Sequence, residues 1–194
     1  DTNAVADVFL RDTFMGTTQR VSVSSDGIQA NAASADGMDV SDGGRYVSFV
    51  SYADNLAGDD ANGVRDVFRH DTWTGRTECA SVGLDGQPSN GESRWTSLSA
   101  DGRYLAFYSN ATNIVPGVLT AVNHCYVSDM VLGTTILVDV TPEGVPGNQR
   151  AYGPVLSEDG RTVLFVSDAT NLVADDTNNV GDVFVRDLAT GVTT

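Results

Sequence analysis

The sequence predicts an all-β protein built from tandem four-stranded antiparallel sheets, and three observations lead to this fold class. One residue pattern recurs along the 194-residue chain at intervals of about 58 residues. Each interval contains four short runs rich in β-branched and aromatic residues, and turns containing Gly separate these runs. No segment shows the apolar spacing of an amphipathic helix, so we expect none.

Two sets of anchor residues define the repeat, and each set has a constant spacing of 58 residues. The anchors are Arg45, Arg103 and Arg161, together with Asn55, Asn113 and Asn171. The segment Asp1 to Gln19 returns in related form at Asp176 to Thr194. The chain is therefore expected to contain three periods plus an overlap of 19 residues.

The third period shows the four expected strands in order. Thr96 to Ser99 is the first, and the turn after it contains Asp-Gly, which is typical of a β-hairpin. Arg103 to Ser109 is the second strand, because apolar residues recur along it before a long loop begins. His124 to Asp129 forms the third strand, and the turn Met-Val-Leu-Gly connects it to the fourth, Thr134 to Val140.

Tandem four-stranded units favour a β-propeller, because each small sheet needs a similar neighbour to cover its faces. The first strand of each unit should line a central channel and the fourth should lie at the rim. We expect one propeller segment divided into a partial blade (1–36), two blades (37–94 and 95–152) and a second partial blade (153–194). Closed propellers have about 4 to 8 blades. About three and a third blades therefore predict either a piece of a longer chain or copies that complete one another.

The composition excludes several classes of function. The net charge is −15, and the 11 cationic residues, all Arg, form no cluster, so the protein's own field repels nucleic acid and anionic lipid. No apolar run has the length of a membrane-spanning helix, so we expect no membrane insertion. The 22 Asp far outnumber the 4 Glu, which indicates turns and metal-binding loops in preference to exposed helices.

The hairpin between the first two strands carries a recognisable motif, S-x-D-G-R-Y-x-x-F-x-S, which occurs here as SADGRYLAFYS. It resembles the TolB-like β-propeller repeat family. The following pattern, D-x-N-x-x-x-D-V-F-x-R-D-x-x-T-G, is similar to a long-loop variant common in secreted bacterial proteins. This resemblance implies a propeller located outside the cell, in the periplasm or on the cell surface. For function it implies a binding platform, an accessory domain of a peptidase or, occasionally, an enzyme.

The loop between the second and third strands is the strongest candidate for chemistry, because Asp and Asn recur there at positions 1, 3 and 7. The predicted ligands are Asp1, Asn3, Asp7, Asp60, Asn62, Asp66, Asp176, Asn178 and Asp182. Such side-chain oxygens, with a backbone carbonyl at position 5, can surround Ca²⁺, which prefers about 6 to 8 oxygen ligands. The third period has Val118, Thr120 and His124 at the three positions, as expected if the ligands are lost together. The alternative is that Asp and Asn only cap turns of the loop.

Other polar residues have structural interpretations. Asn31, Asn90 and Asn148 follow a Gly-containing turn at a fixed position and are expected to cap backbone groups. Cys125 replaces a Val of the other copies and should be buried, whereas Cys79 should lie on a rim strand, so we expect no disulfide between them.

The sequence contains no known catalytic motif, and few acids break the repeat, as a catalytic pair should; four of them are candidates. These acids are Asp39, Glu78, Glu92 and Asp139, and each is expected on a solvated strand face. Phe14 and Trp73 lie in turns between the third and fourth strands, and Trp95 precedes an inner strand. Each of these aromatic residues is expected either to anchor a partner or to pack on a neighbouring turn.

These observations predict a non-enzymatic, calcium-stabilised propeller module of a secreted or cell-surface bacterial protein, which binds or scaffolds a protein or glycan partner. Two alternatives remain open at this stage. Copies of the chain could assemble into a ring or filament through the incomplete terminal blades. The chain could also be the propeller domain of a larger hydrolase.

Overall fold

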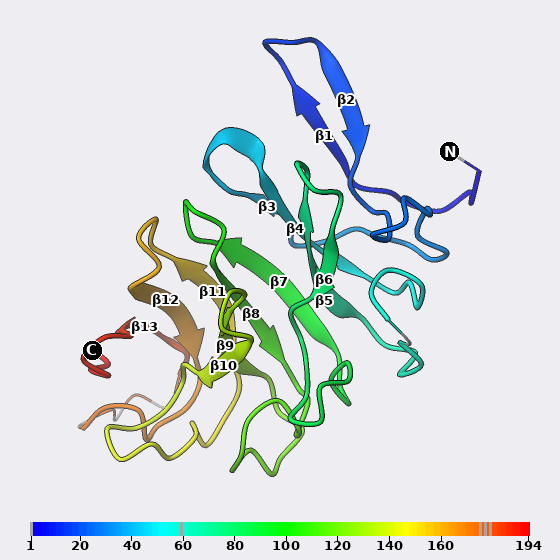
Figure 1. The fold of residues 1–194 in the computed structure, drawn as a ribbon. Helices are drawn as coiled ribbons and strands as arrows, with labels where there is room; N and C mark the ends of the chain where they lie inside the picture. The colour runs from blue at the N-terminus through cyan, green and yellow to red at the C-terminus, as the bar shows by residue number, and fades with distance from the viewer. Residues whose placement is uncertain (1, 59, 175, 177, 179) are drawn as a thin grey trace.

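The computed structural model describes residues 2–58, 60–174, 176, 178 and 180–194. These residues form four antiparallel sheets that follow one another along the chain (Figure 1). The strands are β1 (Phe9–Asp12) and β2 (Thr17–Arg20); β3 (Asp39–Val40), β4 (Tyr46–Ser51), β5 (Asp66–Asp71) and β6 (Thr77–Cys79); β7 (Ser93–Leu98), β8 (Tyr104–Ser109), β9 (His124–Asp129) and β10 (Thr134–Leu137); and β11 (Ala151–Leu156), β12 (Thr162–Ser167) and β13 (Asp182–Asp187). A short 3₁₀ turn, Asp42–Gly44, lies between β3 and β4. The predicted all-β propeller architecture is confirmed.

The two central sheets contain four strands in sequential order, β3-β4-β5-β6 and β7-β8-β9-β10. The first sheet is the pair β1-β2, and the last is β11-β12-β13, extended by an isolated bridge between Arg186 and Thr193. We call the sheets blades 1 to 4 in chain order. The four strands predicted for the third period are all present. However, β7 begins at Ser93 and β11 at Ala151, so both strands start upstream of the predicted blade borders.

A β-bulge explains the early start of these inner strands. The pairing register shifts between Arg94 and Ser97 in β7, and between Tyr152 and Val155 in β11. A bulge interrupts the alternation of side chains, so the residues before it do not continue the sequence pattern of the strand. The backbone at the bulge adopts a left-handed conformation, with φ of 61° at Trp95 and 63° at Gly153.

Three apolar clusters fill the spaces between adjacent blades. The cluster between blades 2 and 3, for example, joins Val50 and Val67 to Leu105, Phe107 and Tyr126. In blades 2 to 4, an aromatic residue of the second strand stacks on one of the third strand. The centroid distances are 5.9 Å for Phe49 and Phe68, 5.6 Å for Phe107 and Tyr126, and 5.6 Å for Phe165 and Phe184. Each sheet is thus covered by the next one, as the tandem arrangement requires.

The Gly and Tyr of the D-G-R-Y motif connect neighbouring blades. A Cβ atom added at Gly102 would lie 2.2 Å from the ring of Tyr46, and one added at Gly160 would lie 2.3 Å from the ring of Tyr104. The turn of each blade therefore packs directly on the tyrosine of the blade before it. Hydrogen bonds at the same level reinforce the contact, because Ala100 N donates to the carbonyl oxygen of Glu158 (2.8 Å). The recurrence of this motif thus has a packing explanation.

The Arg of the same motif forms an ion pair within its own blade. Arg45 donates to both carboxylate oxygens of Asp71 (3.2 and 2.9 Å), and Arg103 binds Asp129 at distances down to 2.6 Å. These guanidinium groups lower the pKa of Asp71 and of Asp129 to about 2. No part of the chain that the structure describes forms a helix long and apolar enough to cross a membrane.

Candidate functional site

The middle acidic loop, residues 60–66, contains two buried carboxylates. Asp60 is 5% exposed and Asp66 is fully buried. Asn62 lies between them: its Nδ2 donates to Asp66 Oδ2 (2.6 Å) and to the carbonyl oxygen of Ser89 (2.9 Å), and its Oδ1 accepts from Val64 N (2.9 Å). Asn62 is thus fully engaged in forming the loop, as the turn-capping interpretation expects. The two carboxylates remain as candidates for binding a cation.

Burial raises the pKa of Asp66 to about 7, against the hydrogen bonds that it accepts from Ser81 and Asn62, and the nearby Asp60 raises it further. The pKa of Asp60 is also raised, mainly by burial. In the part of the chain that the structure describes, no cationic side chain pairs with either group. This loop therefore holds two carboxylates in an environment that disfavours their charged form.

The first acidic loop differs, because its last carboxylate already has a cationic partner. Arg20 Nε lies 3.6 Å from Asp7 Oδ2, whereas the residue corresponding to Arg20 in the middle copy is Cys79. Asp7 also accepts hydrogen bonds from Ser22 Oγ (2.8 Å) and Gln29 Nε2 (3.0 Å). Asn3 donates to the carbonyl oxygen of Ala30. The predicted ligand Asp1 lies outside the described residues.

The last acidic loop brings its three predicted ligands around one hollow. Asp176, Asn178 and Asp182 all line a cavity of about 250 Å³. Asn178 Nδ2 donates to both oxygens of Asp182 (3.2 and 2.9 Å), which repeats the contact between Asn62 and Asp66. No three His, Cys, Asp or Glu residues converge on a metal position anywhere in the described chain. A cation in these loops would therefore need backbone oxygens or water in addition to the carboxylates.

The third-period loop is stabilised by apolar burial. Ile114, Val115 and Val118 join the core between blades 2 and 3, and Val118 occupies the position of Asp60. The acid has changed sides: His124 stands in the place of Asp66, and Asp139, in the segment after β10, stands in the place of Ser81. This exchange replaces a hydrogen bond between Ser and Asp by a buried contact between His and Asp.

The exchange corrects the prediction that Asp139 lies on a solvated strand face. Asp139 is fully buried, its Oδ2 lies 2.6 Å from His124 Nδ1, and its Oδ1 accepts from Cys125 N (2.7 Å). Burial raises the pKa of Asp139, while the hydrogen bond from His124 acts in the opposite direction. Blades 2 and 3 thus each keep one buried acid at this place, contributed by Asp66 in blade 2 and by Asp139 in blade 3. The sequence shows this only when both facing segments of the two blades are compared.

The other three acids that break the repeat are half-buried and form specific contacts. Asp39 Oδ2 accepts from Leu98 N of the next blade (2.7 Å), and Glu92 Oε2 binds Arg94. Glu78 Oε2 accepts from Arg69 Nη2 (2.7 Å). These three acids thus remain partly exposed, as a solvated strand face requires, and each also accepts a hydrogen bond from a neighbouring donor.

The three loop asparagines cap backbone groups, as predicted. Asn90 N donates to Asn113 Oδ1 (2.9 Å), and Asn90 Oδ1 accepts from Thr112 N (2.9 Å). Asn148 forms the same pair of bonds with Asn171 and Thr170, and Asn31 with Asn55 and Asp54. Both cysteines are free; Cys125 is buried, and Cys79 is half-buried at the end of β6. These predictions are confirmed.

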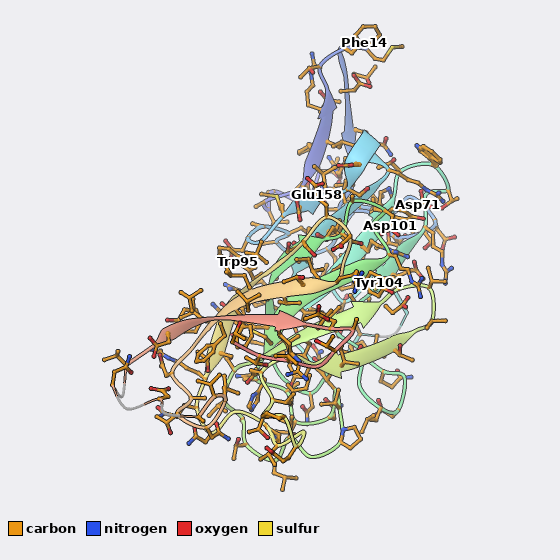
Figure 2. All side chains as sticks on the ribbon, turned by 90° about the vertical axis from the view of Figure 1, so that its left-hand side faces the viewer. Phe14, Asp71, Trp95, Asp101, Tyr104 and Glu158 are labelled. Atoms are coloured by element: carbon orange, nitrogen blue, oxygen red, sulfur yellow. The ribbon has the colours of Figure 1, made fainter. Side chains whose placement is uncertain are left out.

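The exposed aromatic residues occupy different environments. Phe14 is 95% exposed at the tip of the β1-β2 hairpin (Figure 2). Trp73 is 73% exposed, and the guanidinium of Arg45 lies 4.6 Å from its ring centroid. Trp95 is 48% exposed and sits at the bulge of the inner strand β7.

Trp95 has an unusual backbone conformation for a tryptophan. The corresponding residues are Gly37 and Gly153, which have φ of 50° and 63°. A left-handed backbone suits Gly but costs a bulky residue about 1 to 3 kcal/mol. The signal was available in the sequence, because only one of three equivalent positions lacks Gly. A half-exposed tryptophan held in this conformation is a candidate contact residue.

No protein-family model and no curated protein sequence matches the chain. Solved structures, in contrast, match its fold. TolB from Acinetobacter baumannii superposes with a TM-score of 0.53 at 17% identity over 97% of this chain and 37% of its own. A TolB-type protein from Agrobacterium tumefaciens gives a TM-score of 0.58 at 17% identity over 97% of this chain and 55% of its own. The tricorn protease gives 0.53 at 16% identity over 93% of this chain and 16% of its own.

These matches show a β-propeller of the kind found in TolB and in peptidase propellers. The chain spans only part of each matched protein, from 16% to 55% of its length. Identities this low carry information about the fold and not about activity.

Proposed function

We propose that the chain is part of a non-catalytic β-propeller that binds or scaffolds a protein or glycan partner at a bacterial cell surface or outside the cell, with Ca²⁺ stabilising its acidic loops. The observation that carries the proposal is the pair of buried carboxylates Asp60 and Asp66, for which the described residues supply no cationic partner.

The donor set fits a hard cation in part. Two carboxylates and nearby backbone carbonyls are the oxygen ligands that Ca²⁺ prefers, whereas Asn62 directs its amide nitrogen at Asp66 and its oxygen at Val64 N. A bound cation would supply positive charge to Asp60 and Asp66 and so keep both ionised. The middle loop is therefore the best candidate for a calcium site. The first loop is the weakest candidate, because Arg20 already forms an ion pair with Asp7.

The state of the two histidines supports a non-catalytic role. His70 and His124 are each 1% exposed, and their ring nitrogens contact Thr77 and Asp139. A general base must reach the substrate directly or through one water. Neither histidine offers a surface at which a substrate could bind.

Trp95 is the residue that we assign to partner binding. A propeller presents its inner strands to the channel and its loops to the two faces, and β7 is such an inner strand. The backbone strain at Trp95 is unfavourable for stability, and strained residues that persist often serve binding. An aromatic side chain that is half-exposed can cover an apolar face of a sugar or a protein.

Isothermal titration with CaCl₂ tests the cation part of the proposal. We expect saturable binding that is weakened in Asp66→Asn, whereas Asp26→Asn, a substitution of an exposed loop acid, should bind as the wild type does. Equal binding by Asp66→Asn and Asp26→Asn would mean that calcium binds elsewhere. Absence of binding by the wild type would refute the calcium site.

Retention on immobilised bacterial cell-envelope glycans and proteins tests the partner part. Wild-type protein should be retained, and Trp95→Ala should lose retention, while Trp73→Ala serves as the matched control at another exposed tryptophan. Equal retention of both variants would refute the role assigned to Trp95.

A further inference from the structure

A small gap lies between neighbouring blades, bounded by the third and fourth strands of one blade and the first turn of the next. β1 and β2 correspond to the third and fourth strands of the other blades. In blades 1 to 3, the residue of the third strand that faces the gap is Leu10, Arg69 and Val127, respectively. Their partners on the fourth strand are Gln19, Glu78 and Ile136. The identity of these pairs decides whether the gap is filled.

Arg69 fills the gap between blades 2 and 3. Its guanidinium carbon lies 4.5 Å from the ring centroid of Tyr46, its Nη1 donates to the carbonyl oxygen of Gly102 (2.6 Å), and its Nη2 donates to Glu78 (2.7 Å). The side chain is almost completely buried. This gap thus shows which contacts the fold offers to a guanidinium group at this position.

The gap between blades 3 and 4 has the same contact between a tyrosine and a glycine turn but lacks the arginine. Tyr104 and Gly160 repeat the close contact of Tyr46 and Gly102, as the Cβ distances of 2.3 and 2.2 Å show. Val127 and Ile136 replace the ion pair, and a cavity of about 310 Å³ opens between β9, β10 and the turns after β11 and β13. Its volume is at the lower end of the range for small-ligand pockets, about 300 to 1,000 Å³.

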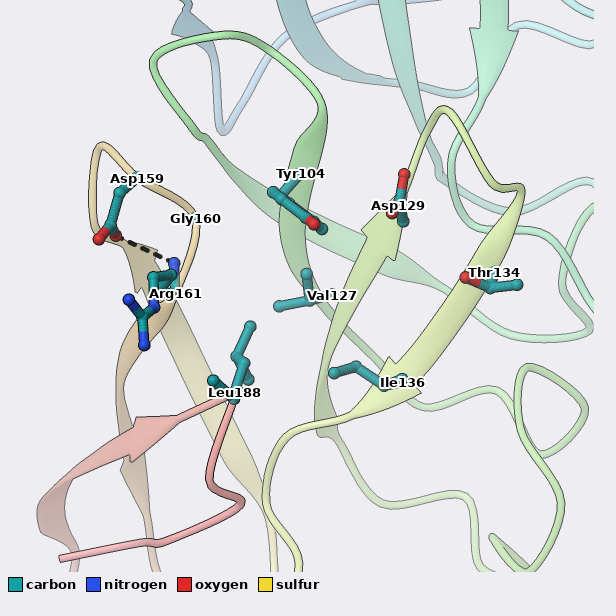
Figure 3. Close-up of a pocket in the computed structure, with 10 residues that line it drawn as sticks. Tyr104, Val127, Asp129, Thr134, Ile136, Asp159, Gly160, Arg161 and Leu188 are labelled. Atoms are coloured by element: carbon teal, nitrogen blue, oxygen red, sulfur yellow. Dashed lines mark hydrogen bonds between the residues drawn. The ribbon is translucent and has the colours of Figure 1, made fainter.

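The lining of this cavity suits an alkyl chain that ends in a planar cation. Val127, Ile136 and Leu188 point toward the same space, with Tyr104 on the side opposite Ile136 (Figure 3). Among the described residues, no donor reaches the carbonyl oxygen of Gly160, whose counterpart in Gly102 accepts from Arg69. The gap between blades 1 and 2, which has Leu10 in place of Arg69, is also hollow, with about 460 Å³. That gap has no tyrosine corresponding to Tyr104.

The charges at the rim nearly cancel. Asp129 is paired with Arg103, and Asp159 accepts from Ser157 Oγ (2.6 Å) and from the backbone N of Arg161 (3.0 Å). The exposed Arg161 side chain points away from Tyr104 (Figure 3). Attraction of a cation therefore comes from the Tyr104 ring, from the free carbonyl and from the net charge of −15.

We propose that this pocket binds the side chain of an arginine from a partner protein, in the position that Arg69 occupies in the neighbouring gap. The guanidinium stacks on Tyr104 and donates to the Gly160 carbonyl oxygen, while its methylene groups contact Val127, Ile136 and Leu188. Guanidinium is suited to this role because it is planar, permanently charged and weakly hydrated. The proposal rests on the binding function above and specifies one feature of the partner.

The test uses N-acetyl-arginine methylamide as the probe and follows the amide and methyl resonances of the protein by NMR. We expect saturable shifts for residues around Tyr104, Val127 and Ile136, and weaker binding as salt rises from about 0.05 M to about 0.5 M. The citrulline analogue, which has the same shape without the charge, should bind at least about tenfold more weakly.

A pair of double variants makes the test specific. Val127→Arg with Ile136→Glu installs the arginine pair of blade 2 and should abolish the shifts. Val185→Arg with Thr194→Glu adds the same charges at the equivalent positions of blade 4, outside the pocket, and should leave binding unchanged.

Three results would overturn the proposal: no saturable shift with the arginine probe, binding of the citrulline analogue as strong as that of the arginine probe, or undiminished binding by the double variant Val127→Arg with Ile136→Glu. These outcomes are independent of the calcium and Trp95 experiments, because the probe detects the pocket directly. If the arginine probe does not bind, the proposed binding function can still hold. If the calcium and Trp95 tests fail, the arginine pocket can still be present.

Discussion

The contact between Gly160 and Tyr104 predicts that adding a single methyl group at the blade junction is costly. In Gly160→Ala, the new Cβ would lie 2.3 Å from Tyr104 Cδ2 and 3.1 Å from two further ring atoms. Carbon atoms in contact are normally about 3.5 to 4.0 Å apart, so the ring or the turn must move by more than about 1 Å. Overpacking of this kind costs about 1 to 3 kcal/mol.

The backbone adds a second cost, because Gly160 has φ of 69°. A left-handed conformation disfavours Ala by about 1 to 2 kcal/mol. Together the two effects predict a loss of about 2 to 5 kcal/mol in the free energy of unfolding. For a chain of this size, each kcal/mol corresponds to about 2 to 4 °C in the melting temperature. Urea and thermal unfolding followed by circular dichroism measure both quantities.

Two controls separate packing from backbone strain. Gly144→Ala has φ of 82° and no atom within 4 Å of the new Cβ, so it should cost only the backbone share, about 1 to 2 kcal/mol. In a Tyr104→Ala background the ring is absent, and Gly160→Ala should then cost about as much as Gly144→Ala. If Gly160→Ala lowers the free energy of unfolding no more than Gly144→Ala in the wild-type background, the contact between Gly160 and Tyr104 does not stabilise the junction of these blades.

Three further predictions concern single residues. Trp95→Gly should be more stable than Trp95→Ala by about 1 kcal/mol in urea unfolding, the reverse of the usual order in strands, because φ at this position is 61°; the usual order would show that the bulge carries no strain. In EDTA, wild-type stability should fall as the pH rises from about 4 to about 8, because the folded state, with an Asp66 pKa of about 7, holds a proton that the unfolded state releases near 3.8. Asp66→Asn should remove the share of Asp66, on the order of 4 kcal/mol, and leave the smaller contributions of the other acids with raised pKa values, Asp60 and Asp139; an unchanged pH profile would contradict the raised pKa of Asp66. Asp129 has its pKa lowered to about 2 by Arg103, so its contribution to stability is present above pH 3.8 and is lost as the pH falls through 2; Asp129→Asn should lose less stability than the wild type over this acid range, and parallel acid titrations of the two proteins would contradict it.

The recurrence of residues made the fold predictable from sequence. Arg103 and Asn113 are visible because their counterparts stand 58 residues away on either side, and a tandem unit with four strands leaves few folds other than a propeller. The strands of the third period follow directly from the Asp-Gly turn and the alternating runs. The start of β7 was not predictable in this way, because the bulge at Trp95 breaks the alternation.

The candidate site was only partly predictable, because its chemistry depends on neighbours that are distant in sequence. Asp7 and Asp66 have the same sequence context, yet only Asp7 has an arginine beside it, since Cys79 replaces Arg20 in the middle copy. The sequence placed His124 at the position of Asp66, but the burial of Asp139 follows only from its contact with His124 across the blade. Repeated positions share a backbone environment, but each side chain still depends on what the facing strand carries.

The pocket between blades 3 and 4 could not be predicted from the sequence. Arg69 contacts Gly102, which lies 33 residues further along the chain and in the next blade. The replacement of Arg69 by Val127 reads as an ordinary apolar substitution until that contact is known. Only the three-dimensional arrangement shows that it opens a cavity.

Calorimetric melting in excess CaCl₂ and in EDTA tests the calcium-stabilised propeller most directly. Ligand at about 100 times its dissociation constant stabilises the folded state by about 2.7 kcal/mol, which corresponds to about 5 to 10 °C for a chain of this size. We predict an increase of this order for the wild type and for Asp26→Asn, and a much smaller one for Asp66→Asn. A melting temperature that is the same in CaCl₂ and in EDTA would contradict the assignment of Asp60 and Asp66 as cation ligands.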